Sequence, residues 1–330
     1  MDDSEDRDDP VKSAFGGSVD LYDVADWDVR TRLDGAAVGI YNALHAGRSW
    51  ALVFIAGLLF AAQLSLAVVL VIDRPVLGAL ALVSVVPALG LVGYFWYDDP
   101  TRREPLEPLA VTFLLSILFA TFAAVLNTVF LPPFAFLPVV GLPLFFFLVV
   151  GPVEESVKWL AVRLYAYRDD SFDTVVDGMV YGAVAGLGFA ATENFAYIVS
   201  EYLRLVELGT VGFDSVSQVA LARAFVGPGH VIYSAFAGYY LGLAKFNPGR
   251  RGPIVVKGLL VAAFIHALYN TVVFALPFNA VSFVAFVVFY DGVLILVLSR
   301  KLRRYESFYT RIPLSAGGDG ASETEAETGE

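Results

Sequence analysis

The chain has 330 residues, of which 57% are hydrophobic and 17% charged, and its mean hydropathy is +0.67. This composition is too apolar for an ordinary water-soluble domain, so we expect a membrane protein. The absence of cysteine excludes disulfides, thiol catalysis and cysteine-based metal sites. The net charge of -11 argues against a nucleic-acid partner, because phosphate binding needs a surplus of Lys and Arg on one face.

Eight apolar runs have the length that a hydrocarbon slab of ~30 Å requires. They cover residues 50–72, 75–96, 108–130, 142–164, 175–199, 219–245, 254–276 and 280–298. None shows a sustained period-two alternation, so helices are expected rather than strands of a barrel. The predicted fold is all-α: a polytopic integral membrane bundle of about eight transmembrane helices.

The basic residues predict the orientation, because Lys and Arg concentrate in cytoplasmic loops. They gather after the second, fourth, sixth and eighth runs, whereas the other loops carry little beyond Arg74 and Arg204. We therefore expect a plasma-membrane protein with both termini in the cytoplasm, as an even number of crossings requires. The basic residues are Arg102, Arg103, Arg163, Arg168, Lys245, Arg250, Arg251, Arg300, Lys301, Arg303 and Arg304.

The segments outside the apolar runs differ in composition. Residues 1–27 are acidic and turn-rich, and residues 300–330 are first basic and then acidic, so we expect both tails to be disordered. In residues 28–48 apolar side chains recur at helical spacing, which indicates an amphipathic helix at the membrane surface. Residues 49–299 then form the transmembrane domain. His45 is assigned no role.

Ionisable side chains lie inside four consecutive predicted helices. A charge near the bilayer centre costs roughly 2.5 to 3.5 kcal/mol on insertion scales, so such groups are functional candidates. Adjacent helical residues point about 100° apart, so Glu154 and Glu155 should have different roles, and Lys158 should pair with Glu154 at i,i+4. The candidates are Glu154, Glu155, Lys158, Asp177, Glu193, Asn194, Tyr197, Arg223, His230, His266 and Asn270.

Two chemistries suit this set of side chains. Two glutamates and two histidines from four helices could bind a divalent metal such as zinc, with a carboxylate left over as general base. The same groups support a metal-free mechanism, in which Glu activates water and the histidines stabilise the oxyanion. Pro152, just before the glutamates, could open the helix to water. The zincin motif HExxH and the nucleophile elbow GxSxG are both absent.

The motifs also resemble those of a known family. The Glu154-Glu155-x-x-Lys158 motif, the element from Phe189 to Tyr197, the element from Arg223 to His230, and His266-x-x-x-Asn270 look like successive motifs of the PrsW family of intramembrane proteases. The resemblance covers about residues 145–275. The CAAX-processing and bacteriocin-processing membrane proteases are similar, but they have histidine where this chain has Glu193.

The resemblance implies hydrolysis of a peptide bond in a membrane-anchored protein within the lipid bilayer, such as an anti-sigma factor. It implies that Glu154 and Glu155 are the essential carboxylates, His230 and His266 the essential imidazoles, and Glu193 a further ligand or acid. The predicted metal ligands, for Zn²⁺, are His230, His266, Glu193 and Glu155. Asn270 or Asn194 would then stabilise the oxyanion.

Other interpretations of the same residues remain open. Buried Glu and His also form proton relays, so a transporter or channel is one alternative, and a non-catalytic scaffold is another. Glu193 could be a structural partner of Arg223, and His266 a packing residue. Asp177 is expected to be structural, near a helix N-terminus. The small residues Gly182, Gly186 and Gly188 are expected to allow close helix packing.

Overall fold

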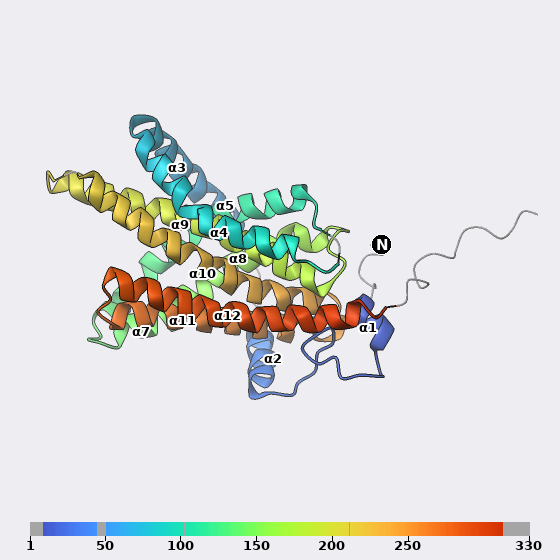
Figure 1. Ribbon diagram of the computed structural model, residues 1–330. Helices are drawn as coiled ribbons and strands as arrows, with labels where there is room; N and C mark the ends of the chain where they lie inside the picture. Colours follow the sequence, from blue (N-terminus) through green and yellow to red (C-terminus); the bar gives the residue numbers. More distant parts are fainter. Residues whose placement is uncertain (1–8, 45–50, 102, 211, 313–330) are drawn as a thin grey trace, which may run out of the picture.

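The computed structural model describes residues 9–44, 51–101, 103–210 and 212–312, and their regular structure is helical apart from one isolated β-bridge, between Tyr22 and Asp26 (Figure 1). The longer helices are α2 (Arg32–Leu44), α3 (Ala51–Asp73), α4 (Pro75–Tyr97), α5 (Leu106–Phe130), α8 (Gly151–Leu164), α9 (Val175–Glu207), α10 (Phe213–Lys245), α11 (Arg251–Ala275) and α12 (Ala280–Tyr309). The short elements are α1 (Pro10–Phe15), α6 (Pro132–Ala135), α7 (Gly141–Phe145), the π-helix η2 (Phe146–Val150) and the 3-10 turns η3 (Ala166–Arg168) and η4 (Pro248–Arg250).

Each of the eight predicted apolar runs coincides with helix in the structure, the fourth being the continuous succession of α7, η2 and α8. Five of the described segments are long and apolar enough to cross a membrane: α4, α5, α9, the segment Pro248–Ala275 that contains α11, and α12. The prediction of an all-α, polytopic membrane protein is confirmed. The number of eight crossings stays a prediction.

Helices α9 and α10 pack against each other along most of their length and form the centre of the bundle (Figure 1). Their backbones approach closely because glycines face the contact: a Cβ on Gly182 would lie 2.3 Å from the Ser234 carbonyl oxygen, and one on Gly186 would lie 2.3 Å from the His230 carbonyl oxygen. Gly188 makes a similar approach to Phe113 of α5. The predicted packing role of these glycines is confirmed, and the contact at Gly186 brings α9 up to His230.

The N-terminal segment packs on the bundle, so the predicted disorder of residues 1–27 is wrong for residues 9–27. Helix α1 lies beside the end of α12, where the rings of Phe15 and Phe308 are 5.7 Å apart (Figure 1). Val11, Leu21, Val24 and Trp27 are buried. Residues 1–8 lie outside the described part of the chain.

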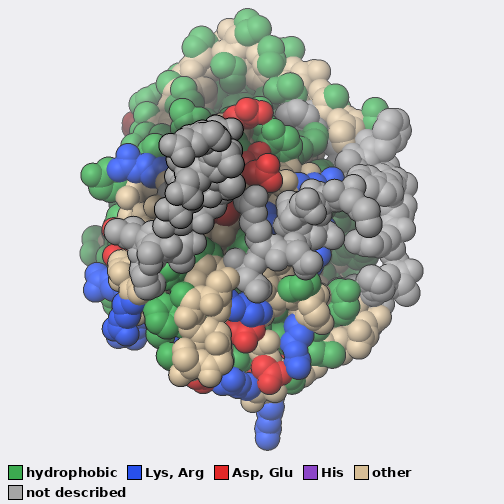
Figure 2. Space-filling model, turned by 90° about the vertical axis from the view of Figure 1, so that its right-hand side faces the viewer, with side chains coloured by type: hydrophobic (Ala, Val, Ile, Leu, Met, Phe, Trp, Pro, Cys, Tyr) green, Lys and Arg blue, Asp and Glu red, His purple; other side chains and the backbone are tan. Residues whose placement is uncertain are grey.

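Basic side chains from distant helices neutralise the acids of this segment. Asp23 binds Lys257 of α11 at 3.2 Å and Lys301 of α12 at 2.5 Å, and Asp34 of α2 binds Lys257 at 2.9 Å. Figure 2 looks onto this end of the molecule, where Lys and Arg side chains lie among acidic and apolar ones. Asp23, one of the acids of residues 9–27, is therefore held by tertiary ion pairs and does not belong to a disordered tail.

The other two terminal predictions have mixed outcomes. A helix is present within residues 28–48, as α2, and it packs against α11, while its location at the membrane surface stays a prediction. Disorder from residue 300 onward is wrong for residues 300–309, because α12 continues to Tyr309 and buries Tyr305. Residues 313–330 and His45 lie outside the described residues.

The buried carboxyl of Asp9 should make the stability of this end depend on pH. Its Oδ2 accepts hydrogen bonds from the Tyr305 hydroxyl at 2.5 Å and the Val175 N–H at 3.2 Å, and burial raises its pKa from 3.8 to about 6. The folded protein thus binds this proton more tightly than the unfolded chain does. Asp9 should therefore lower the free energy of unfolding by about 3 kcal/mol as the pH rises from about 4 to about 6.

Asp9→Asn should remove this contribution, which denaturation of the purified protein across this pH range would measure. Asp20→Asn is the control: Asp20 is exposed, and its hydrogen bonds with Arg30 lower its pKa, so this variant should alter the pH profile in the opposite sense. An unchanged pH profile in Asp9→Asn would contradict the prediction.

Candidate active site

One cavity of about 560 Å³ brings most of the predicted site residues together. Helices α5, α8, α9, α10, α11 and α12 contribute to its wall, together with α7 and η2. Five of the six predicted catalytic side chains line it, namely Glu154, Glu193, His230, His266 and Asn270. The sixth, Glu155, lies behind this lining and contacts His266. The motifs therefore converge on a single chamber, as their sequence predicts.

A local irregularity of the helix presents the two glutamates. The π-helix η2 immediately precedes α8, and Pro152, which lacks an N–H, is the second residue of α8. Gly151 permits close contact with α11, because a Cβ there would lie 2.6 Å from the Ala263 carbonyl oxygen. These features bring Glu154 and Glu155 beside His266, which follows Ala263 by three residues in α11.

Glu154 faces the cavity, and one of its oxygens has no hydrogen-bond partner. Its Oε1 accepts a hydrogen bond from Nδ2 of Asn127 at 2.9 Å. Its Oε2 is buried without a partner in the described structure, and lies 3.7 Å from Nε2 of His266. Asn127 was not among the predicted site residues, and its only signal in the sequence is a polar amide inside an apolar run.

Glu155 is fully buried and both of its oxygens are engaged. Oε1 lies 2.7 Å from Nζ of Lys158 and 2.9 Å from Nδ1 of His266, and Oε2 accepts from Oγ of Ser234 at 3.3 Å. The predicted pairing of Lys158 with Glu154 is therefore wrong, because Lys158 binds Glu155 at i,i+3. The two adjacent glutamates thus have different surroundings, and their different roles stay a prediction.

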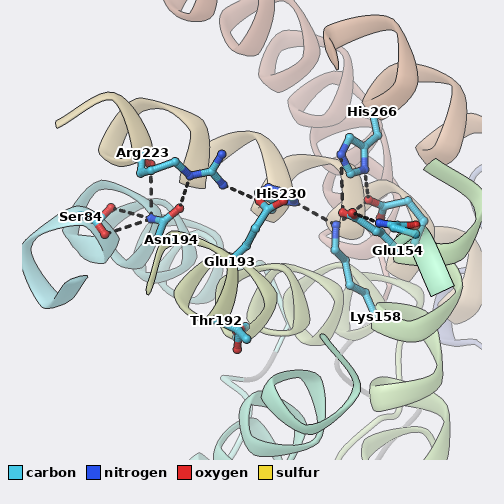
Figure 3. A network of polar contacts seen from close by, with 12 residues as sticks. Ser84, Glu154, Lys158, Thr192, Glu193, Asn194, Arg223, His230 and His266 are labelled. Atoms are coloured by element: carbon cyan, nitrogen blue, oxygen red, sulfur yellow. Dashed lines mark hydrogen bonds and ion pairs between the residues drawn. The ribbon is translucent and has the colours of Figure 1, made fainter. Parts of the chain in front are cut away.

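The partners of the two histidines indicate which ring nitrogens carry protons. The carboxylate of Glu155 can only accept, so Nδ1 of His266 donates to it and Nε2 of His266 keeps a free lone pair. The Lys158 ammonium can only donate, at 3.0 Å, to Nδ1 of His230. Nε2 of His230 then donates to Glu193 Oε2 at 2.8 Å. Figure 3 shows this chain of contacts between His266 and Glu193.

Glu193 also pairs with Arg223, which continues the network to its other end (Figure 3). Asn194 holds Arg223 in place: its Oδ1 accepts from Nε of Arg223 at 2.9 Å, and its Nδ2 donates to the Ser84 hydroxyl at 3.1 Å. The proposed oxyanion role of Asn194 is not supported, because its buried amide is engaged by Arg223 and Ser84 and Asn194 does not line the cavity. Arg223 also lies over the ring of Tyr197, 4.4 Å from its centroid.

Glu154, His230 and His266 form a group that could hold a metal ion, since one ligand atom from each lies within 4.8 Å of the others. Zinc bonds of roughly 2.0 to 2.2 Å place neighbouring tetrahedral ligands roughly 3 to 4 Å apart, which suits the 3.7 Å between Glu154 Oε2 and His266 Nε2. The unpartnered Oε2 fits the same role. Glu155, one of the predicted ligands, has both oxygens engaged by Lys158, His266 and Ser234.

Asp177 has the structural surroundings that were expected. With Thr174 it forms the capping box at the start of α9. The Thr174 side chain accepts from the backbone N–H of Asp177, and the Asp177 side chain accepts from the backbone N–H of Thr174. It does not line the cavity.

The comparisons with known proteins agree with this geometry. Residues 104–296 match the family model described as PrsW family intramembrane metalloprotease. The chain is 30% identical over 199 residues to Protease PrsW of Geobacillus kaustophilus, and the match covers 58% of this chain and 78% of that protein. It is 28% identical over 197 residues to Protease PrsW of Bacillus subtilis, and that match covers 58% of this chain and 82% of the relative. No solved structure matches. The family match includes every residue that lines the cavity, and the chain belongs to the PrsW family of intramembrane metalloproteases.

Proposed function

We propose that Glu154, His230 and His266 hold a divalent ion, most simply Zn²⁺, for hydrolysis of a peptide bond in a membrane-anchored protein. The observation that carries this proposal is the buried Oε2 of Glu154, which has no hydrogen-bond partner and faces Nε2 of His266. Imidazole and carboxylate ligands suit zinc. When bound, the ion polarises the scissile carbonyl and makes a neighbouring water more acidic.

The remaining residues orient these groups and move protons. Glu155 accepts from Nδ1 of His266 and so fixes the ring with Nε2 toward the cavity, as carboxylates do behind metal-binding histidines. To hold an ion through Nε2, His230 would have to release the proton that Nε2 donates to Glu193, and its Nδ1 would take a proton from Lys158, so that the ring stays neutral. The Glu193 carboxylate would then be free to act as general base. Arg223 orients Glu193, and Asn270 donates to the oxyanion from the cavity wall.

A metal-free reaction with the same residues is the second candidate. The observation that favours it is the hydrogen bond from Nε2 of His230 to Glu193, which occupies the nitrogen that an ion would need. In this version Glu193 or Glu154 activates water, and the Nε2–H of His230 donates to the oxyanion; His266 could donate only when it is also protonated at Nε2. The metal content of the protein decides between the two.

Metal analysis of the purified protein tests the proposal. We expect about one ion per chain in the wild type and in His45→Ala, which alters a histidine without an assigned role, and a loss of the ion in His266→Ala. A chelator should stop cleavage and added Zn²⁺ should restore it. Equal, negligible metal in the wild type and in His266→Ala, with cleavage that resists the chelator, would reject the ion and leave the glutamate route.

We propose further that the substrate is a membrane-anchored regulatory protein, such as an anti-sigma factor, and that it enters from the outer leaflet of the plasma membrane. The cavity is lined by the C-terminal part of α9 and the N-terminal part of α10, whose connecting loop is predicted to lie outside. The end of the bundle that carries α1 and the C-terminal end of α12 would then be cytoplasmic. A substrate trapped by Glu193→Gln in native membranes would identify the target.

A further inference from the structure

Three buried polar side chains on α10, α11 and α12 take no part in the hydrogen-bond network described above, although one of them, Tyr269, lines the cavity. They are Tyr233 of α10, Tyr269 of α11 and Asp291 of α12, which are 2%, 5% and 7% exposed. The two hydroxyl oxygens and Oδ1 of Asp291 have no hydrogen-bond partner in the described structure. Three unpartnered polar atoms in one part of a membrane bundle are unusual, because buried polar groups are nearly always hydrogen-bonded.

The three side chains belong to one cluster. The rings of Tyr233 and Tyr269 are 6.4 Å apart, and the ring of Tyr269 is 5.8 Å from that of Tyr290, the residue before Asp291 in α12. Tyr290 is already satisfied, since it donates to the Ile265 carbonyl at 2.5 Å. Among the ion pairs of the described residues none includes Asp291. The carboxyl group is therefore buried next to this group of tyrosines, and no cation pairs with it among the described residues.

Tyr233 connects this cluster to the active site. Its ring stacks on His266 with a centroid distance of 5.2 Å and an interplanar angle of 28°, and it lies 6.3 Å from the ring of His230. His266 is thus held through Nδ1 by Glu155 and on its face by Tyr233. Gly229 leaves the room for this arrangement, because a Cβ there would lie 2.7 Å from the Tyr233 hydroxyl oxygen.

We propose that Tyr233, Tyr269 and Asp291 form a buried water-binding pocket beside His266, and that Tyr233 and Asp291 are positioning residues for that histidine. A buried water typically makes about three hydrogen bonds to otherwise unsatisfied groups, and these three side chains supply that number of partners. Water bound there fixes the hydroxyl of Tyr233, and the stacked ring then fixes the plane of His266. The inference rests on the proposed function only for the role of His266.

Steady-state cleavage and thermal unfolding of the same preparations test the positioning role. Tyr233→Phe and Asp291→Leu remove a partner of the water and should lower kcat about tenfold or more, with KM and Tm unchanged or Tm raised. Asp291→Asn keeps hydrogen-bonding atoms and should retain most of kcat. The control Tyr305→Phe removes another buried hydroxyl, bonded to Asp9 at 2.5 Å, and should lower Tm but not kcat.

Three outcomes would overturn the proposal: an unchanged kcat in both Tyr233→Phe and Asp291→Leu, a loss of kcat that follows a loss of Tm, or an Asp291→Asn variant as impaired as Asp291→Leu. A second measurement does not depend on activity. An experimental structure that shows ordered water should place one within hydrogen-bond distance of Asp291 and a tyrosine hydroxyl, and its absence rejects the pocket. Full activity in His266→Ala would instead reject the proposed function, whatever the water shows.

Discussion

Glu154→Gln is expected to lower kcat/KM by about 10³-fold or more and to remove the bound ion, with little change in stability. The carboxylate offers an unengaged oxygen to an ion, since its Oε2 is buried and has no hydrogen-bond partner in the described structure. Gln keeps an oxygen that can accept from Asn127, as Oε1 does at 2.9 Å. The variant therefore removes a ligand without breaking the contacts that hold α8 in place.

Cleavage of a membrane-anchored substrate, metal content and thermal unfolding should be measured on one preparation. Asn127→Ala is the matched control: it removes the hydrogen bond to Oε1 but leaves the carboxylate, so it should bind the ion and retain more activity than Glu154→Gln. Wild-type activity with full metal content in Glu154→Gln would contradict the assignment of Glu154 as a ligand.

The sequence was sufficient to predict that the motifs meet, and insufficient to predict which atoms meet. Ionisable groups in consecutive apolar helices must face one another or water, which places Glu154, Glu193, His230 and His266 around one cavity. Helical periodicity does not distinguish i+3 from i+4, so it could not show that Lys158 binds Glu155.

Contacts between distant parts of the chain account for the other differences. Asn194 follows Glu193 directly, yet it is turned toward Ser84 of α4, a partner that nothing in its own helix indicates. In the sequence Asp23 belongs to an acidic segment that is expected to be disordered, whereas in the structure it pairs with Lys257 and Lys301. Tyr233 and Asp291 belong to no motif, and their significance appears only when α10, α11 and α12 are packed together.

Glu155→Gln is expected to reduce both stability and activity, which separates its role from that of Glu154. Lys158 and Glu155 are both fully buried, and their side chains are 2.7 Å apart. Removing the carboxylate charge leaves a buried ammonium without its counter-ion, which should lower the free energy of unfolding by about 3 to 5 kcal/mol. The loss of the acceptor for Nδ1 of His266 should lower metal affinity by about 10- to 100-fold.

Adding Lys158→Met to Glu155→Gln distinguishes the two effects. It removes the uncompensated charge, together with the donor to Nδ1 of His230, but it does not restore the acceptor for Nδ1 of His266. Replacing both members of a buried ion pair is often neutral, so the double variant should regain most of the lost stability and remain impaired in metal binding and cleavage. Unfolding in detergent and metal titration would measure this. If activity returned together with stability, Glu155 would serve only to neutralise Lys158, and the orientation of His266 would have another cause.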